Sequence, residues 1–150
     1  MEIVAQTLIE NFVSHKKIAI IGLSRKGTGF GVMALKELEQ KGYQVSPIHH
    51  EVKEINGHAT VKSVAELPQD VESLLVCLPP QKTVELLETL PGSRVKNVWI
   101  QQGASDEKVL EKIEELGIKA VVNKCILMYA EPVKGLHKFH KVINNFFSKN

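Results

Sequence analysis

The chain of 150 residues is 43% hydrophobic and 24% charged, values typical of a soluble protein with one domain and a core of its own. Its formal net charge of +2 gives no signal for a polyanionic partner, so we expect no nucleic acid. No apolar run approaches the roughly 18 residues that a membrane helix requires, so we expect no membrane span. The start, Met1-Glu-Ile-Val, lacks the basic and apolar regions of a signal peptide, which favours a cytoplasmic protein.

The predicted elements begin with a helix over residues 4–13, whose apolar residues follow helical spacing. The short apolar run Ile18–Ile21 predicts the first buried strand. A glycine-rich turn then leads into a helix that starts at Gly31 and ends at Lys41-Gly42, where glycine suits the C-cap. The rest follows in the order strand 43–49, an irregular connection 51–68 with one helical turn over 61–67, strand 73–78, helix 81–90, strand 95–101, helix 106–116, strand 119–123 and helix 136–146.

This alternation predicts an α/β fold with a Rossmann-like, doubly wound parallel sheet of about five strands. We expect a single domain over residues 1–150 with an extra C-terminal helix. In the helix before Gly117, Ser105 is the expected N-cap, and Val109, Leu110, Ile113 and Leu116 are expected on one face. A ligand of such a sheet lies over the carboxyl ends of the strands, at the switch point beside the first strand.

The glycine-rich turn is the most informative segment of the chain. The sequence Gly22-Leu-Ser-Arg-Lys-Gly27-Thr-Gly29-Phe-Gly31 follows a buried strand and opens a helix. Glycines let the backbone approach an anion, and a helix N-terminus offers N–H groups and a positive dipole end, so the order predicts a phosphate site. The dinucleotide fingerprint G-x-G-x-x-G would need glycine at Ser24, and the adjacent Arg25 and Lys26 suit a ligand with more phosphate charge than NAD. The alternative is a loop that merely turns the chain.

Three further strand ends supply candidate residues. Pro47-Ile48-His49 closes the second strand. Glu51 lies near the distance from the glycines at which NAD-binding sheets hold the ribose, but beyond the expected end of the strand. His49 and its neighbour His50 either face an adenine or a phosphate or lie on a solvated loop. Leu78-Pro79-Pro80 forms a rigid wall without proline N–H donors, which suits an adenine or simply ends the strand. Gln101-Gln102-Gly103 offers amides for phosphate oxygens or a pantetheine amide, unless a glutamine only satisfies a neighbouring carbonyl.

The sequence contains no recognisable catalytic constellation. The six histidines show no metal-ligand spacing, and neither a nucleophile elbow nor a P-loop occurs. Cys125, directly after the last strand, is the one nucleophile candidate near the expected site, and a reduced, buried structural thiol is the favoured alternative for it and for Cys77. We therefore favour a binding protein over an enzyme and expect no metal.

Four strand ends match a known family in order. The segments IAIIGLS (18–24), GYQVSPI (42–48), VWIQQG (98–103) and VVNKCI (121–126) resemble the stand-alone CoA-binding domain proteins, which are similar to the N-terminal domain of the succinyl-CoA synthetase α subunit. The resemblance runs through most of residues 10–130 and implies a Rossmann-like fold that binds CoA or acyl-CoA. It implies these ligand contacts: Gly22, Ser24, Arg25, Lys26, Thr28, Gly29, Phe30, Gly31, Pro47, Ile48, His49, Leu78, Pro79, Pro80, Gln101, Gln102 and Gly103.

The leading hypothesis is a CoA- or acyl-CoA-binding module that acts as a carrier, sensor or regulatory partner. One alternative is an NAD(P)-binding redox protein or sensor, and another is a detached subunit of an acyl-CoA synthetase-type enzyme. The length of the glycine loop and the missing acid at the end of the second strand favour CoA over NAD(P). The C-terminal helix, with Phe139, Ile143 and Phe146 on one face, is expected to dock on the sheet or to form a homodimer contact.

Overall fold

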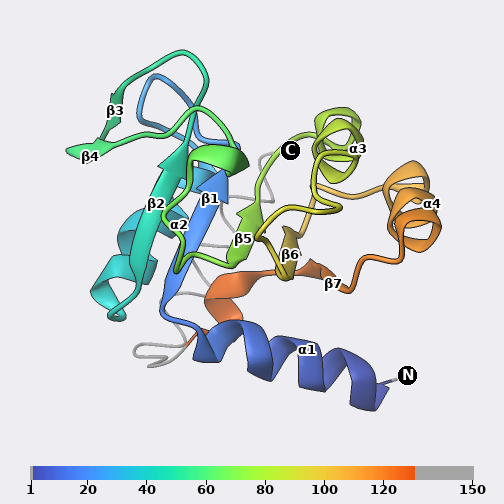
Figure 1. Ribbon diagram of the computed structural model, residues 1–150. Coiled ribbons are helices and arrows are strands. Elements are labelled where there is room, and N and C mark those ends of the chain that lie inside the picture. The colour runs from blue at the N-terminus through green and yellow to red at the C-terminus, as the bar shows by residue number, and fades with distance from the viewer. Residues whose placement is uncertain (1, 131–150) are drawn as a thin grey trace.

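A five-stranded parallel sheet with strand order β2-β1-β5-β6-β7 forms the centre of the molecule (Figure 1). The computed structural model describes residues 2–130, so the expected C-terminal helix lies outside the described residues. The strands of this sheet are β1 (Lys17–Ile21), β2 (Gln44–Ile48), β5 (Ser73–Val76), β6 (Asn97–Gln101) and β7 (Ala120–Lys124). The predicted α/β fold with a parallel sheet is confirmed.

Helices cover both faces of the sheet because the strands bury apolar side chains on both sides. The α-helices are α1 (Glu2–Ser14), α2 (Phe30–Gln40), α3 (Pro80–Leu87) and α4 (Glu107–Leu116). In β1, Ile18 and Ile20 pack into the core beneath α1 and α2, whereas Ala19 packs into the core beneath α3 and α4. This alternation makes the sheet doubly wound. In the part of the chain described, no helix is long and apolar enough to cross a membrane.

A buried aromatic cluster explains why α1, which precedes the first strand, packs over β6 and β7. Trp99 in β6 is fully buried, with its ring centroid 5.4 Å from that of Phe12 in α1 and 5.7 Å from that of Tyr129. Its indole Nε1 donates a hydrogen bond to the carbonyl oxygen of Lys124 at 2.9 Å. The ring thus links α1 to the far edge of the sheet while its polar atom stays satisfied.

The first turn of α4 corrects the predicted N-cap. Asp106, not Ser105, caps this helix, because its Oδ1 accepts a hydrogen bond from the backbone N–H of Val109 at 3.0 Å. The Ser105 hydroxyl instead donates to Asn123 Oδ1 at 2.7 Å. Val109 faces the core, whereas Leu110, one helical step further round, is 42% exposed.

The connection between β2 and β5 contains a short hairpin that the sequence analysis missed. β3 (Glu54–Ile55) and β4 (His58–Ala59) pair antiparallel around Asn56-Gly57, whose φ angles are 49° and 80°. Two positive φ angles in a two-residue turn are the geometry that Asn-Gly favours in hairpins. The predicted helical turn follows as a single 3₁₀ turn, Val64–Glu66.

His58 ties this hairpin to α2 and should make stability depend on pH. Its Nε2 hydrogen-bonds to Glu39, and this bond raises the pKa of His58 above its ordinary value against the opposing effect of burial. Because the pKa of His58 is higher in the folded than in the unfolded protein, the pair stabilises the fold fully at pH values below the unfolded-state pKa of about 6.5. This stabilisation is lost as the pH rises through the folded-state pKa. The pair is partly exposed, so we expect a contribution below about 1 kcal/mol.

Urea unfolding on both sides of neutral pH measures this contribution. The His58→Gln and Glu39→Gln variants should each lose the extra stability of the wild type at acidic pH, and the double variant should lose no more than either. An equal pH dependence in all four proteins would contradict the assignment.

Candidate functional site

The strand order places the candidate site at the carboxyl ends of β1 and β5. The chain runs from β1 to β2 on one side of β1 and then crosses to β5 on the other side. Ligands of open α/β sheets bind at such a switch point. The backbone N–H of Cys77 donates to the carbonyl oxygen of Ile21 at 2.8 Å and holds the two strand ends together just before the chain turns.

Gly22 is required where β1 ends because the backbone of the neighbouring strand passes too close for any side chain. Its φ is +106°, and a Cβ would lie 2.4 Å from the carbonyl carbon of Cys77 and 2.8 Å from the backbone nitrogen of Leu78. Gly31, inside α2, has a related packing role, since a Cβ there would lie 3.1 Å from the carbonyl oxygen of Gly22. The first and last glycines of the loop therefore pack α2 and β5 against the end of β1.

The N-terminus of α2 opens toward this edge without a side-chain cap. Its N-cap is Gly29, with φ +96° and open space where a Cβ would stand. The first turn of an α-helix leaves N–H groups without acceptors inside the helix, and the positive end of the helix dipole lies there. The arrangement is one that an anionic group can fill.

Two adjoining cavities lie at this edge of the sheet. The first, which we call the glycine-loop cavity, has a volume of about 480 Å³, and the second, the histidine-side cavity, about 540 Å³. Both are bordered by Gly22, Leu23, Leu78 and Lys82. Among the residues expected from the sequence, the glycine-loop cavity adds Ser24, Thr28, Gly29, Phe30, Gly31, Pro79, Gln101, Gln102 and Gly103, and the histidine-side cavity adds Arg25, Ile48 and His49.

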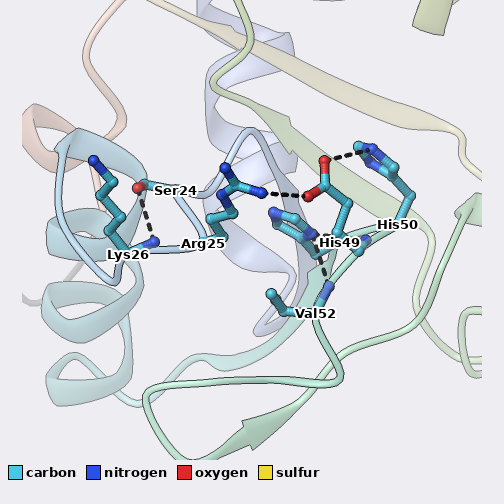
Figure 2. A network of polar contacts seen from close by, with 7 residues as sticks. Ser24, Arg25, Lys26, His49, His50 and Val52 are labelled. Carbon is cyan, nitrogen blue, oxygen red and sulfur yellow. Dashed lines mark hydrogen bonds and ion pairs between the residues drawn. The ribbon is translucent and has the colours of Figure 1, made fainter.

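Three of the expected residues border neither cavity. Pro47 is buried within β2, one residue before the strand end. Pro80 is the first residue of α3, where a missing N–H costs no hydrogen bond. Lys26 is exposed, and its backbone N–H donates to Ser24 Oγ at 3.1 Å, while its side chain points away from the side chain of Arg25 (Figure 2).

The structure adds two lysines that the sequence analysis did not select. Lys82 borders both cavities, in the first turn of α3. Because Lys82 follows the predicted end of the strand at Pro80 by only two residues, the sequence could have indicated that it lies near the site. Lys62 borders the histidine-side cavity because a parallel bridge between Ile48 and Val61 brings its segment to the sheet edge. No pattern in the local sequence predicts that long-range bridge.

Gln101 carries a buried amide group with one donor atom unused. The side chain is 2% exposed, and its Oε1 accepts a hydrogen bond from the backbone N–H of Ile126 at 3.0 Å. Because a backbone N–H only donates, this bond fixes which end of the amide is oxygen. Nε2 has no hydrogen-bond partner, an arrangement that costs about 1–3 kcal/mol when nothing compensates for it. Gln101 also borders the glycine-loop cavity, and its Nε2 is a buried donor without a partner.

A polar network borders the histidine-side cavity, and Figure 2 shows its side chains. Arg25 Nη1 lies 2.9 Å from Glu51 Oε2, and His50 Nε2 lies 3.1 Å from Glu51 Oε1. His49 Nδ1 accepts hydrogen bonds from the backbone N–H groups of Glu51 at 3.0 Å and Val52 at 3.2 Å. A neutral His49 ring with Nδ1 as acceptor carries its proton on Nε2, which makes Nε2 a donor.

Neither cysteine is set up as a nucleophile. Burial, and to a smaller extent the nearby Cys125, raises the pKa of the Cys77 thiol. Burial also raises the pKa of Cys125, although the nearby Gln101 side chain and the backbone N–H groups of Leu127 and Met128 act in the opposite direction. The thiolate is the nucleophilic form, and the raised pKa values disfavour it in both residues. Cys125 is buried as expected, whereas Cys77 is partly exposed and borders the glycine-loop cavity. Within residues 2–130, no group of histidine, cysteine and acidic side chains is arranged to hold a metal ion.

The fold is that of a doubly wound α/β protein with a glycine-rich loop at its switch point. The chain belongs to the CoA-binding domain family, whose model, described as "CoA binding domain", matches residues 16–131. The resemblance inferred from the four strand ends is therefore confirmed.

Relatives share most of this chain at low identity. The uncharacterized protein YneT of Bacillus subtilis is 24% identical over 111 residues, which are 74% of this chain and 82% of YneT. The alpha subunit of the ADP-forming acetate–CoA ligase II of Pyrococcus furiosus is 26% identical over 130 residues, which are 79% of this chain but 28% of that subunit. A solved structure of a hypothetical protein from Pyrococcus horikoshii OT3 superposes with a TM-score of 0.74 at 27% identity, over 87% of this chain and 92% of that one.

Proposed function

We propose that this protein binds CoA or acyl-CoA in the crevice at the ends of β1 and β5 and acts as a single-domain carrier, sensor or regulatory partner without a reaction of its own. The observation that carries the proposal is the glycine loop of a CoA-binding family member. Gly22 is packed against the backbone of β5, and the uncapped start of α2 lies directly behind the loop.

The residues present fit the chemistry of such a ligand. The diphosphate suits the glycine loop, where the helix N-terminus and the Ser24 and Thr28 hydroxyls offer hydrogen-bond donors. The pantetheine arm carries amide carbonyls, and the unused Nε2 of Gln101 is a buried donor for such an acceptor. The nucleotide part suits the histidine-side cavity, which the cationic side chains of Arg25 and Lys82 border.

The NAD(P) alternative lacks its usual determinant. A dinucleotide site places a carboxylate at the end of the second strand to hold the ribose hydroxyls. Here β2 ends at Ile48, and Glu51, three residues further on, is paired with Arg25 and His50. That carboxylate is already engaged by partners from this chain.

The match to the ligase subunit supports a second candidate function. The chain spans 28% of that subunit, so it corresponds to a part of the larger protein. In this second proposal the protein supplies the CoA-binding part of an acyl-CoA ligase whose remaining parts lie on another chain. Co-purification of ligase activity with the tagged protein from its own cells would separate this candidate from a stand-alone module.

Thermal unfolding and calorimetry with CoA, acetyl-CoA, NAD, NADP and ATP test the proposed ligand. A ligand that binds only the folded state should add about 2.7 kcal/mol of stability at about 100 times its dissociation constant. We expect this gain with CoA or acetyl-CoA and none with NAD. Stabilisation by NAD without stabilisation by CoA would overturn the proposal.

A further inference from the structure

Glu51 occupies an unusual place in a site expected to take anions. Its carboxylate lies between Arg25 on the glycine loop and His50 beyond β2, at 2.9 Å and 3.1 Å (Figure 2). All three residues border the histidine-side cavity. A negative charge at this point opposes an anionic ligand and at the same time engages the guanidinium that such a ligand would use.

The backbone of Glu51 is held in place while its pair with Arg25 is weakly held. His49 Nδ1 accepts the N–H groups of both Glu51 and Val52, which fixes the turn that carries the carboxylate. In contrast, the Arg25 and Glu51 side chains are 67% and 47% exposed, and exposed ion pairs are weak and screened by salt. The guanidinium can therefore change partners, whereas the carboxylate stays beside the cavity.

We propose that a phosphate monoester on the ligand displaces Glu51 as the partner of Arg25, so that Glu51 sets how strongly the site prefers phosphorylated nucleotides. The inference rests on the proposed function, since CoA carries a phosphate monoester on its ribose. A monoester bears a charge of about −1.5 to −2 near neutral pH and offers three acceptor oxygens, against one charge on a carboxylate. A guanidinium group can form paired hydrogen bonds with either a carboxylate or a phosphate, so the more highly charged phosphate is the preferred partner of Arg25.

The test compares CoA with dephospho-CoA, which differ by that one phosphate monoester. Calorimetry at low salt gives both dissociation constants. The dissociation constant of dephospho-CoA divided by that of CoA is the ratio that measures the preference for the phosphate. Glu51→Gln keeps the size of the side chain and removes its charge, so the ratio should rise about threefold or more, with little change for dephospho-CoA. Arg25→Ala should bring the ratio close to one, and the gain from Glu51→Gln should shrink in the Arg25→Ala background.

Glu54→Gln is the matched control, since Glu54 is exposed in β3, carries the same charge and borders neither cavity. It should leave the ratio unchanged, and ligand-free thermal unfolding should show that all variants fold. An unchanged or lower ratio in Glu51→Gln, or an equal rise in Glu54→Gln, would overturn the exchange while the proposed function stands. Failure of the wild type to bind either ligand would overturn both.

Discussion

Replacing Gly22 with alanine should destabilise the protein by about 3 kcal/mol or more and abolish ligand binding with it. The new Cβ would stand 2.4 Å from the carbonyl carbon and 2.5 Å from the carbonyl oxygen of Cys77. These are backbone atoms at the end of a central strand, so they have no rotamer through which to move away. The positive φ of +106° adds a conformational cost for any side chain. Chemical denaturation of both proteins measures the loss.

Gly42→Ala provides the matched control for this prediction. Gly42 has a similar φ of +93°, but a Cβ there would meet nothing within 4 Å. Its substitution should therefore cost only the conformational part, about 1–2 kcal/mol, and leave the crevice intact. Equal losses in the two variants would mean that the contact between the ends of β1 and β5 is not what requires glycine at position 22.

The sheet and the position of the site follow from features that are local in the sequence. β1 and β5 are short apolar runs buried on both faces, which is the usual pattern of strands inside a parallel sheet. Gly22 and Pro79 then mark where the strands stop. Once the strands are parallel, all their carboxyl ends lie at one edge, so the residues after each strand come together without further information.

The features that sequence reasoning missed depend on contacts between distant segments or on very short elements. The Asn56-Gly57 turn was a usable hairpin signal, but strands of two residues each leave no alternating pattern to support it. The contribution of Lys62 follows from the pairing of Ile48 with Val61, and that of Glu51 from its ion pair across 26 residues. The positive charge of Arg25 on the glycine loop was predicted, whereas its ion pair with Glu51 was not.

Lys82→Ala should weaken CoA binding about tenfold or more, a larger loss than Lys26→Ala, although the loop position of Lys26 made it the expected phosphate contact. Lys82 borders both cavities and Lys26 borders neither. A charge-assisted hydrogen bond contributes about 1.5–3 kcal/mol, and tenfold in affinity corresponds to about 1.4 kcal/mol. Calorimetry of the two variants, with Lys36→Ala on the exposed side of α2 as a control for net charge, measures the difference.

The salt dependence of binding sharpens this comparison. A lysine that contacts phosphate should lose more of its contribution as ionic strength rises, because added ions screen its attraction for the ligand. Wild-type and Lys82→Ala affinities should therefore converge at high salt, while wild type and Lys26→Ala should differ little at any salt concentration. A larger loss in Lys26→Ala would instead mean that the glycine loop turns its second cation toward the ligand on binding, and that the two cavities do not define the bound site.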